Sequence, residues 1–280
     1  MILSGFSKRR NTVTSFDTDA QAYFTRLVAT GYTVNNTEKY AIHNFVTTLK
    51  ANSLYTTKIS EMWFLLGNMA ESQSLSFKNT AYNITWAGGP DHRITGVKFN
   101  GVSNYGVTTY RPGPSGAATI NDAHLGVYSR TSTSTSGMTT ESLFGNRVAN
   151  NSMFMIHSRG NNYSNGSSDS AAAYIMTSGG MIGMSGNTNG SSFYLGSRIN
   201  STDGRLFKNG VEIAASTTLN SPSTPNISMY IGACNNAGVA NYFTDKEISF
   251  LISGKGLTTS EVAILSTAVD LLLARLSRKV

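Results

Sequence analysis

Aromatic and amide side chains are the residues of this chain best suited to ligand chemistry. A sugar ring is bound by an aromatic platform together with neutral hydrogen-bonding groups on exposed segments. Seven residues have this chemistry, and we take them as candidate carbohydrate-binding residues: Trp86, Tyr105, Tyr110, Arg111, Asn161, Asn162 and Tyr163. The same residue types also decorate the surface of soluble β-sandwich proteins, so the sequence leaves a sugar site and plain surface decoration both open.

The acidic and histidine residues do not have a spacing that predicts catalysis. A glycosidase on a β-sandwich needs two carboxylates close together over a cleft. The glutamates are scattered, no expected strand carries two of them, and Asp245 and Glu247 alternate only at a turn where a strand begins. The four histidines also make no motif: His43, His92, His124 and His157. We therefore expect no catalytic residues and no enzymatic activity.

Cofactor and metal motifs are likewise missing from the sequence. It contains no phosphate-binding loop, no dinucleotide fingerprint and no zinc-ligand spacing. Asp169, Asp203 and Asp245 have oxygens that calcium accepts, but no expected loop gathers enough of them. Cys234 is the only cysteine, so no intramolecular disulfide can form and a buried apolar role is expected. The sequence predicts neither a cofactor nor a metal.

The net charge of +7 is compatible with an anionic partner or with a modest excess of basic residues along the chain. The only basic clusters, Lys8-Arg9-Arg10 and the group Arg275, Arg278 and Lys279, lie at the two ends. We expect no specific nucleic acid, and we take Lys8, Arg9 and Arg10 as candidate partner-docking residues. The N-terminus lacks the order of a secretory signal, and no apolar run approaches the roughly 20 residues of a membrane span.

Three helical segments are expected before the first of the predicted strands. Residues 1–16 are polar and form a basic arm, and residues 17–67 form a helical anchoring segment. Asp17 caps the first helix, and Asn35 precedes the second, whose apolar residues recur with helical spacing. The alignment of Tyr55 and Leu66 with the apolar residues between them predicts a third helix that ends at Gly67.

From about Ile84 the apolar period changes to two, and some dozen short strands follow. Asn209-Gly210 is the signature of a tight β-hairpin, with Lys208 facing Val211 and Leu206 facing Ile213. So many short antiparallel strands favour two packed sheets. The expected fold is mainly β, a two-sheet antiparallel jelly-roll sandwich over residues 68–280. A capping box at Thr258 opens a C-terminal helix over residues 258–277, which we expect to pack on the sandwich.

Several phrases, in this order, resemble the concanavalin-A-like (laminin-G-like) jelly-roll domains of structural proteins from tailed bacteriophages. The helical lead-in, NTEKYAIHNFVTTLKANSLYTTKISEMWFLLG, is similar to theirs, and AGGPDHRITGVKFNGVSNYGVTTY resembles their first strands. The phrases NDAHLGVYSRT, SFYLGSR with GRLFKNGVEIA, and ISMYIGACNNAG with the helix EVAILSTAVDLLLARLS continue the likeness to the end of the chain. The resemblance covers most of the chain.

The resemblance implies a non-enzymatic virion protein, exposed on the particle as a head fibre, a capsid decoration or a tail-fibre component. Its partners would then be capsid or tail proteins, and a homotrimer is the first expectation for its oligomeric state. It would be made in the cytoplasm of the host bacterium and displayed on the virion surface. The alternative is a lectin-like adhesin that binds host surface glycans, and the two roles can coexist in one protein.

Overall fold

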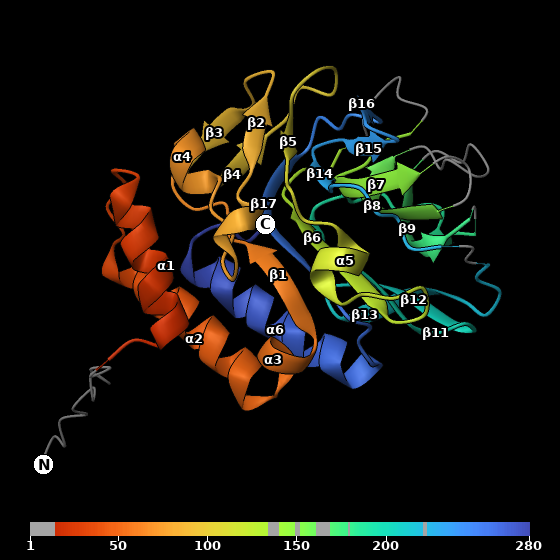
Figure 1. Cartoon of the computed structure of the whole chain (residues 1–280), viewed down its shortest axis with the longest axis horizontal. Helices are drawn as coiled ribbons and strands as arrows, with labels where there is room; N and C mark the ends of the chain where they lie inside the picture. The colour runs from red at the N-terminus through yellow and green to blue at the C-terminus, as the bar shows by residue number, and fades with distance from the viewer. Residues whose placement is uncertain (1–14, 134–139, 149–151, 161–168, 179, 221–222) are drawn as a thin grey trace, which may run out of the picture.

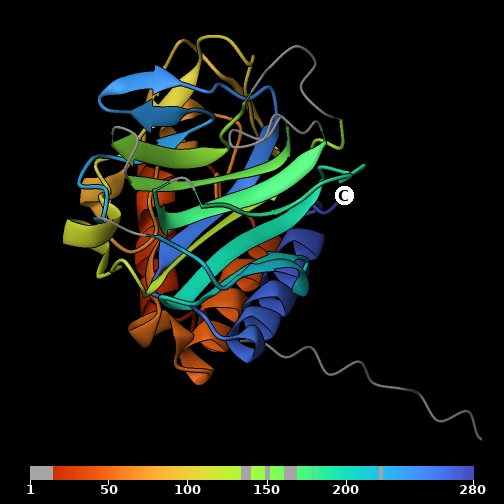
Figure 2. The ribbon, with the colours of Figure 1, turned by 90° about the vertical axis from the view of Figure 1, so that its right-hand side faces the viewer.

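The computed structural model describes the chain in three layers, two β-sheets and a layer of helices (Figures 1 and 2). It describes residues 15–133, 140–148, 152–160, 169–178, 180–220 and 223–280. One core lies between the two sheets and a second lies between one sheet and the helices. We call the sheet in the middle of the molecule the helix-side sheet and the other one the outer sheet.

The helix-side sheet has eight strands. Its order is β13 (Val211–Ser216), β12 (Asp203–Lys208), β11 (Ser192–Asn200), β6 (Ala123–Ser129), β17 (Glu247–Gly254), β4 (Gly96–Lys98) and β3 (Asp91–Arg93), and β1 (Ile59–Trp63) pairs with β17. Strand β17 is apolar on both faces and therefore lies at the centre, with β6 on one side and β1 and β4 on the other.

The outer sheet has nine strands. Its order is β10 (Ile182–Met184), β9 (Ser170–Thr177), β8 (Ser152–Gly160), β7 (Phe144–Val148), β14 (Tyr230–Ile231), β5 (Tyr105–Val107) and β2 (Thr85–Ala87). In addition, β15 (Cys234–Asn236) pairs with β7, and β16 (Val239–Asn241) pairs with β15. In the described part of the chain every pairing is antiparallel except that of β15 with β7. The prediction of a mainly β, two-sheet antiparallel sandwich is confirmed.

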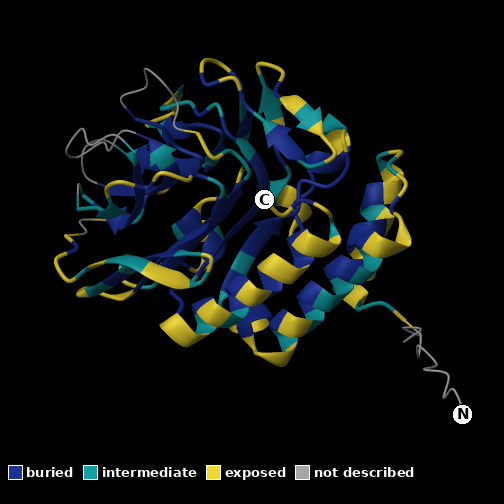
Figure 3. Ribbon diagram, turned by 180° about the vertical axis from the view of Figure 1, so that it is seen from behind, coloured by how far each residue is buried: buried dark blue, intermediate teal, exposed yellow. Residues whose placement is uncertain are grey.

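The helix layer is made by α1 (Thr18–Ala29), α2 (Asn36–Ala51) and α6 (Thr259–Arg275). Asp17 caps α1, and reciprocal capping boxes open α2 at Asn35 with Glu38 and α6 at Thr258 with Glu261. Each helix buries one stripe in the core that it shares with the helix-side sheet and turns the other to solvent, as the colouring of Figure 3 shows. Short helical turns occupy connections: α3 (Leu54–Thr57), α4 (Ala70–Gln73), a 3₁₀ turn at Thr80–Tyr82, and α5 (Pro112–Gly116).

The expected third helix is wrong beyond Thr57. Residues Ile59–Trp63 instead form β1, which pairs antiparallel with β17. Nearly every residue of this segment is buried, and such a short apolar run fits a strand or a helix equally well. The free edge of β17 decides the outcome, because pairing there satisfies the backbone groups of both strands.

The hairpin at Asn209-Gly210 is confirmed, with Lys208 facing Val211. Both turn residues have positive φ, +50° and +81°. The predicted pairing of Leu206 with Ile213 is wrong, because the register shifts between Leu206 and Phe207 and Leu206 faces Ala214. A β-bulge therefore interrupts this ribbon two residues from its turn.

The core between the helices and the sheet unites residues on both sides of the predicted boundary at 67/68. Phe45 on α2 packs edge-to-face against Phe64 and Phe250, and Leu265 and Val269 on α6 are fully buried in the same cluster. The division into an arm, a helical segment and a jelly-roll domain stays a prediction. No helix in the described residues is long and apolar enough to cross a membrane.

Candidate functional site

Two tyrosine rings stack on the solvent side of the outer sheet. Tyr105 on β5 and Tyr230 on β14 have ring centroids 5.1 Å apart and an interplanar angle of 29°. Tyr230 faces Val107 in the register of these strands, so the two tyrosines are diagonal neighbours on one face. Their strand neighbours Gly106 and Ile231 point the other way, into the core between the sheets.

Phe243 completes this surface, which we call the aromatic face: Tyr105, Tyr230 and Phe243. The ring of Phe243 lies 5.9 Å from that of Tyr105 in an edge-on arrangement. All three side chains are half-buried, which holds the rings in place and leaves part of each in contact with solvent. No hydrogen bond to another described residue engages the hydroxyl of Tyr105 or Tyr230. Burial, with Tyr105 as a second cause, raises the pKa of Tyr230, so its hydroxyl keeps its proton at neutral pH.

Of the seven candidate sugar-binding residues, only Tyr105 belongs to the aromatic face. Trp86 is on the neighbouring strand β2, where it pairs with Gly106 in the sheet register. Its ring lies on the other face of the sheet and contacts His92 and Phe99. Its Nε1 donates a hydrogen bond of 3.0 Å to the carbonyl of Ala70 and is therefore occupied. Side chains alternate between the two faces of a strand, so Trp86 and Tyr105 lie on opposite faces of the outer sheet.

Tyr110 cannot be a sugar platform, and this part of the prediction is corrected. Its ring is fully buried, packs against Trp63 and Tyr82, and its hydroxyl donates to Ser253. Arg111 is exposed and is the N-cap residue of α5. Asn161, Asn162 and Tyr163 lie outside the described residues, as do Lys8, Arg9 and Arg10.

Sequence reasoning missed Tyr230 and Phe243. A signal for Tyr230 was present, because Met229 and Ile231 are apolar residues that share a buried face, which puts Tyr230 on the other face. Phe243 stands in the connection after β16, where no period applies. Neither residue could be joined to Tyr105 without the strand order, which places β14 beside β5.

The outer sheet carries a second polar and aromatic contact on its solvent side. Arg147 on β7 donates a hydrogen bond of 2.6 Å to the hydroxyl of Tyr242, and its guanidinium lies over the ring of that tyrosine. Tyr242 packs with the buried residues Met155, Tyr174 and Cys234. Burial raises the pKa of the Cys234 thiol to about 12, which keeps it protonated and unreactive, in agreement with the expected apolar role.

The carboxylates singled out from the sequence are engaged in local ion pairs. Asp169 pairs with Arg159, Asp203 with Arg205, and Asp245 with Lys246. In the part of the chain that the structure describes, no three His, Cys, Asp or Glu side chains are grouped to hold a metal ion. Each of these aspartates therefore already has a positively charged neighbour.

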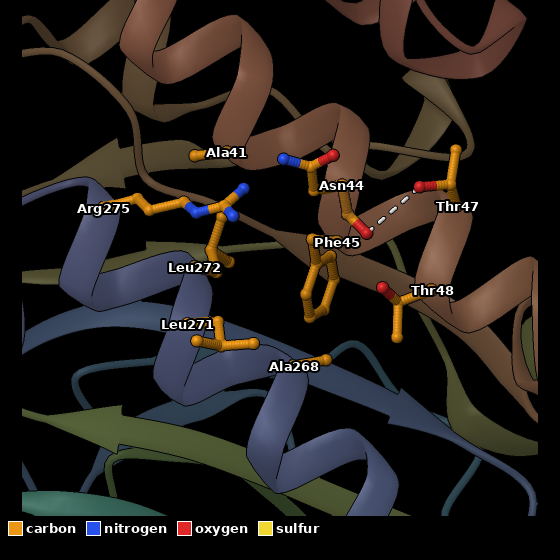
Figure 4. A pocket seen from close by; sticks show the side chains of 9 residues that line it. All are labelled: Ala41, Asn44, Phe45, Thr47, Thr48, Ala268, Leu271, Leu272 and Arg275. Atoms are coloured by element: carbon orange, nitrogen blue, oxygen red, sulfur yellow. Dashed lines mark hydrogen bonds between the residues drawn. The ribbon is translucent and has the colours of Figure 1, made fainter. Parts of the chain in front are cut away.

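A groove of about 260 Å³ lies between α2 and α6 (Figure 4). Figure 4 shows side chains from both helices directed into it, with Arg275 extending from α6 toward α2. Its floor is apolar, but Phe45 is only 2% exposed and offers no ring face to a ligand. The groove follows from the packing of two helices, and we do not assign a sugar to it.

Comparisons with solved structures show what this fold is similar to. A structure of botulinum neurotoxin type C, which depends on interaction with two ganglioside molecules to enter cells, matches 78% of this chain with a TM-score of 0.54 and 12% identity. The binding domain of botulinum neurotoxin DC, in a complex with SialylT, matches 76% with a TM-score of 0.50 and 13% identity. This chain spans about half the length of those two chains, 53% and 52%. No family model and no curated protein sequence matches the chain. At these identities the likeness is one of fold.

Proposed function

We propose that this protein is a lectin-like module that binds glycans through the aromatic face of its outer sheet. The observation that carries the proposal is the stacked pair Tyr105 and Tyr230, with Phe243 beside it. Sugar rings have apolar C–H faces, and they lie against aromatic rings whose positions are fixed by a rigid scaffold. Strands β5 and β14 supply that scaffold.

The chemistry of this face suits a sugar better than an apolar ligand. The tyrosine hydroxyls are free to donate and accept hydrogen bonds at the edge of the rings. The three rings are partly open to solvent, which suits one part of an extended glycan chain. The fold supports the proposal as well, because the botulinum neurotoxin structures that share it interact with gangliosides or were solved with SialylT.

In this proposal the protein binds glycans without cleaving them. Several acidic side chains near strand ends are paired with arginine, as Glu247 is with Arg130 and Arg93. In such a pair the carboxylate oxygens are occupied by a basic side chain, whereas glycoside cleavage needs two carboxyl groups placed together over a cleft. Incubation of the protein with the bound glycan should therefore leave the glycan intact.

A glycan microarray probed with the full chain tests the proposal. The array should include sialylated glycans, because of the neurotoxin structures, together with neutral glycans of bacterial and animal surfaces. We expect saturable binding to a restricted set of glycans that falls in the Tyr230→Ala variant. An array on which the full chain binds nothing above background would contradict the proposal.

A second proposal concerns where the module is displayed. The phrases that resemble phage structural proteins fold here as the hairpin β12–β13, the strand pair β14 and β15, and helix α6. The sequence resemblance of these phrases is what supports a role as an exposed virion component, such as a head fibre, a capsid decoration or a tail-fibre part. In this proposal the helix layer faces the particle and the outer sheet faces the host cell. A homotrimer and docking through Lys8, Arg9 and Arg10 belong to the same proposal.

A further inference from the structure

The aromatic face continues toward one edge of the outer sheet. Strands β14, β5 and β2 lie side by side in that order, as Figure 1 shows, and β2 is the last strand in the order. In the sheet register Tyr230 on β14 faces Val107 on β5, and Val107 faces Thr85 on β2. Residues directly opposite each other on paired strands share a face of the sheet. These three residues therefore form a line across the strands, which we call the cross-strand row.

The cross-strand row lies on the solvent side of the sheet. The residues that follow Thr85 and precede Val107, Trp86 and Gly106, face each other on the other side. A Cβ added at Gly106 would meet the side chains of Ile84 and Trp86, which confirms that this other side is packed. Tyr230 and Val107 are half-buried, and Thr85 is exposed. A ligand on the surface can therefore reach all three members of the row.

The row changes from apolar to polar along its length. Tyr230 offers part of an aromatic ring, Val107 offers methyl groups, and Thr85 ends the row with a hydroxyl. No hydrogen bond to another described residue engages the Oγ1 of Thr85, so this hydroxyl can both donate and accept. Beside the row, Tyr105 faces the small side chain of Ala87, which widens the apolar surface. This order suits sugar rings whose C–H faces rest on apolar side chains and whose hydroxyls reach a polar group at the end.

The row also gives a bound chain a direction. On the β7 side, the residue opposite Tyr230 is Gly145, which is buried and carries no side chain. The surface that the row offers to a ligand therefore stops at Tyr230 on that side. On the other side, β2 pairs only with β5 among the described strands. A glycan seated on Tyr230 can thus extend over Val107 to Thr85 and continue past the edge of the sheet.

The length of the row sets the size of the glycan. Neighbouring strands lie about 4.8 Å apart, so the row spans about 10 Å from the Cα of Tyr230 to the Cα of Thr85. One strand spacing is close to the length of one pyranose unit in an extended chain. A straight row suits a chain joined through equatorial bonds, which is extended, better than a chain that curves into a helix.

From this geometry we infer that the aromatic face binds a linear, equatorially linked glycan of about three units, laid across β14, β5 and β2. Thr85 is the specificity-determining residue that hydrogen-bonds the unit farthest from Tyr230. The inference rests on the proposed function, and it adds the class of glycan, the direction of the chain and the residue that reads its far end.

A series of oligosaccharides of increasing length tests this inference. The full chain is titrated with cello-, manno- and chito-oligosaccharides, from the monosaccharide to the hexasaccharide, and binding is followed by ligand-observed NMR. We expect at least one of these extended series to bind with a Kd that falls up to the trisaccharide and then stays constant. Malto-oligosaccharides, whose axial bonds curve the chain, are the control for shape and should not gain affinity with length.

Three variants locate the two ends of the bound chain. Thr85→Ala should weaken binding of the trisaccharide about fivefold, as expected for the loss of one neutral hydrogen bond, and should leave binding of the monosaccharide unchanged. Tyr230→Ala should weaken binding at every length. Thr217→Ala removes an exposed threonine in the connection after β13, is the matched control and should bind like the parent. Both threonine variants should keep the melting temperature of the parent, because both side chains are exposed.

Failure of this inference differs from failure of the proposed function. The array glycan can bind and depend on Tyr230 while no extended series binds, or while the Kd is the same at every length. Either result overturns the inference and leaves the proposed function standing. A Thr85→Ala variant that binds the trisaccharide as tightly as the parent overturns it as well. A parent that binds neither an array glycan nor any oligosaccharide contradicts both.

Discussion

Tyr105 and Tyr230 come from distant parts of the chain and meet as stacked rings on the solvent side of the outer sheet, 5.1 Å apart. The contact exists because β14 inserts between β7 and β5, so that a late strand pairs with an early one. The inner neighbours of these residues are buried, and this fixes the direction in which the tyrosines point. The proposed glycan site is therefore a product of strand order.

Helix α6 should contribute strongly to stability through its buried stripe. Leu265 is fully buried in the core between helices and sheet, whereas Arg275 in the last turn is exposed. Leu265→Ala should lower the free energy of unfolding by about 2–5 kcal/mol, and Arg275→Ala should change it by less than about 0.5 kcal/mol. Urea denaturation monitored by circular dichroism measures both. Equal, small effects would mean that α6 does not depend on this core.

Glu61 should stabilise the connection that follows β1. Its carboxylate accepts backbone N–H groups from Met62 at 3.0 Å, Lys78 at 2.7 Å and Asn79 at 2.9 Å. Burial raises the pKa of Glu61 to about 7, and the three hydrogen bonds oppose that rise.

At pH 8, where Glu61 is ionised, Glu61→Gln replaces one acceptor with an amide donor facing a backbone N–H. The free energy of unfolding should fall by about 1–3 kcal/mol, measured by urea denaturation. The exposed Glu71 is the control, and Glu71→Gln should have no measurable effect. If the two variants are equally stable, the three backbone contacts do not hold the connection.

Acid should destabilise the protein through two buried histidines. Burial lowers the pKa of His124 and of His157 to about 4, against about 6.5 in an unfolded chain. Between these values the unfolded state binds more protons, so the free energy of unfolding falls as the pH drops from about 6.5 to 4. The full effect is on the order of 3 kcal/mol for each histidine. Glu61 acts in the opposite direction between its ordinary value and about 7.

Comparing the parent with His157→Gln isolates one histidine, since Glu61 and His124 are present in both proteins. The variant should lose less stability than the parent between pH 7 and pH 5 in urea titrations. A parallel loss in the two proteins would show that His157 ionises as readily in the folded state as in the unfolded chain.

The virion proposal predicts that residues 1–14 are needed for attachment to the particle. Deletion of residues 1–14 keeps Phe16, whose ring contacts Phe24, Tyr40 and His43, and keeps the cap residue Asp17. The melting temperature should therefore stay the same, while incorporation into particles falls. Triple replacement of Lys8, Arg9 and Arg10 by serine should have the same effect, and Arg111→Ser is the matched control. Normal incorporation of the truncated protein would place the attachment surface elsewhere.

The sequence predicted the strands, the three long helices and the capping residues because each depends on local periodicity and local hydrogen bonds. It failed at Ile59–Trp63, where helical spacing was overridden by pairing with β17. It also failed at the bulge between Leu206 and Phe207, which the hairpin signal does not encode. Both failures concern contacts made between distant segments.

The candidate site was predicted only in part for the same reason. Tyr105 was identified by its chemistry, but its partners depend on the strand order. Trp86 and Tyr110 had the right chemistry, but the fold places neither of them on the aromatic face. Trp86 lies on the opposite face of the sheet with its N–H bonded to Ala70, and Tyr110 is fully buried.

The affinity of the strongest array glycan for the parent and for Tyr230→Ala, measured by isothermal titration calorimetry, tests the aromatic face most directly. Tyr40→Ala is the matched control, because Tyr40 is also half-buried but lies on α2. Loss of one stacking ring should raise Kd about tenfold or more in Tyr230→Ala, and Tyr40→Ala should bind like the parent. An unchanged Kd in Tyr230→Ala would contradict the assignment of glycan binding to this face.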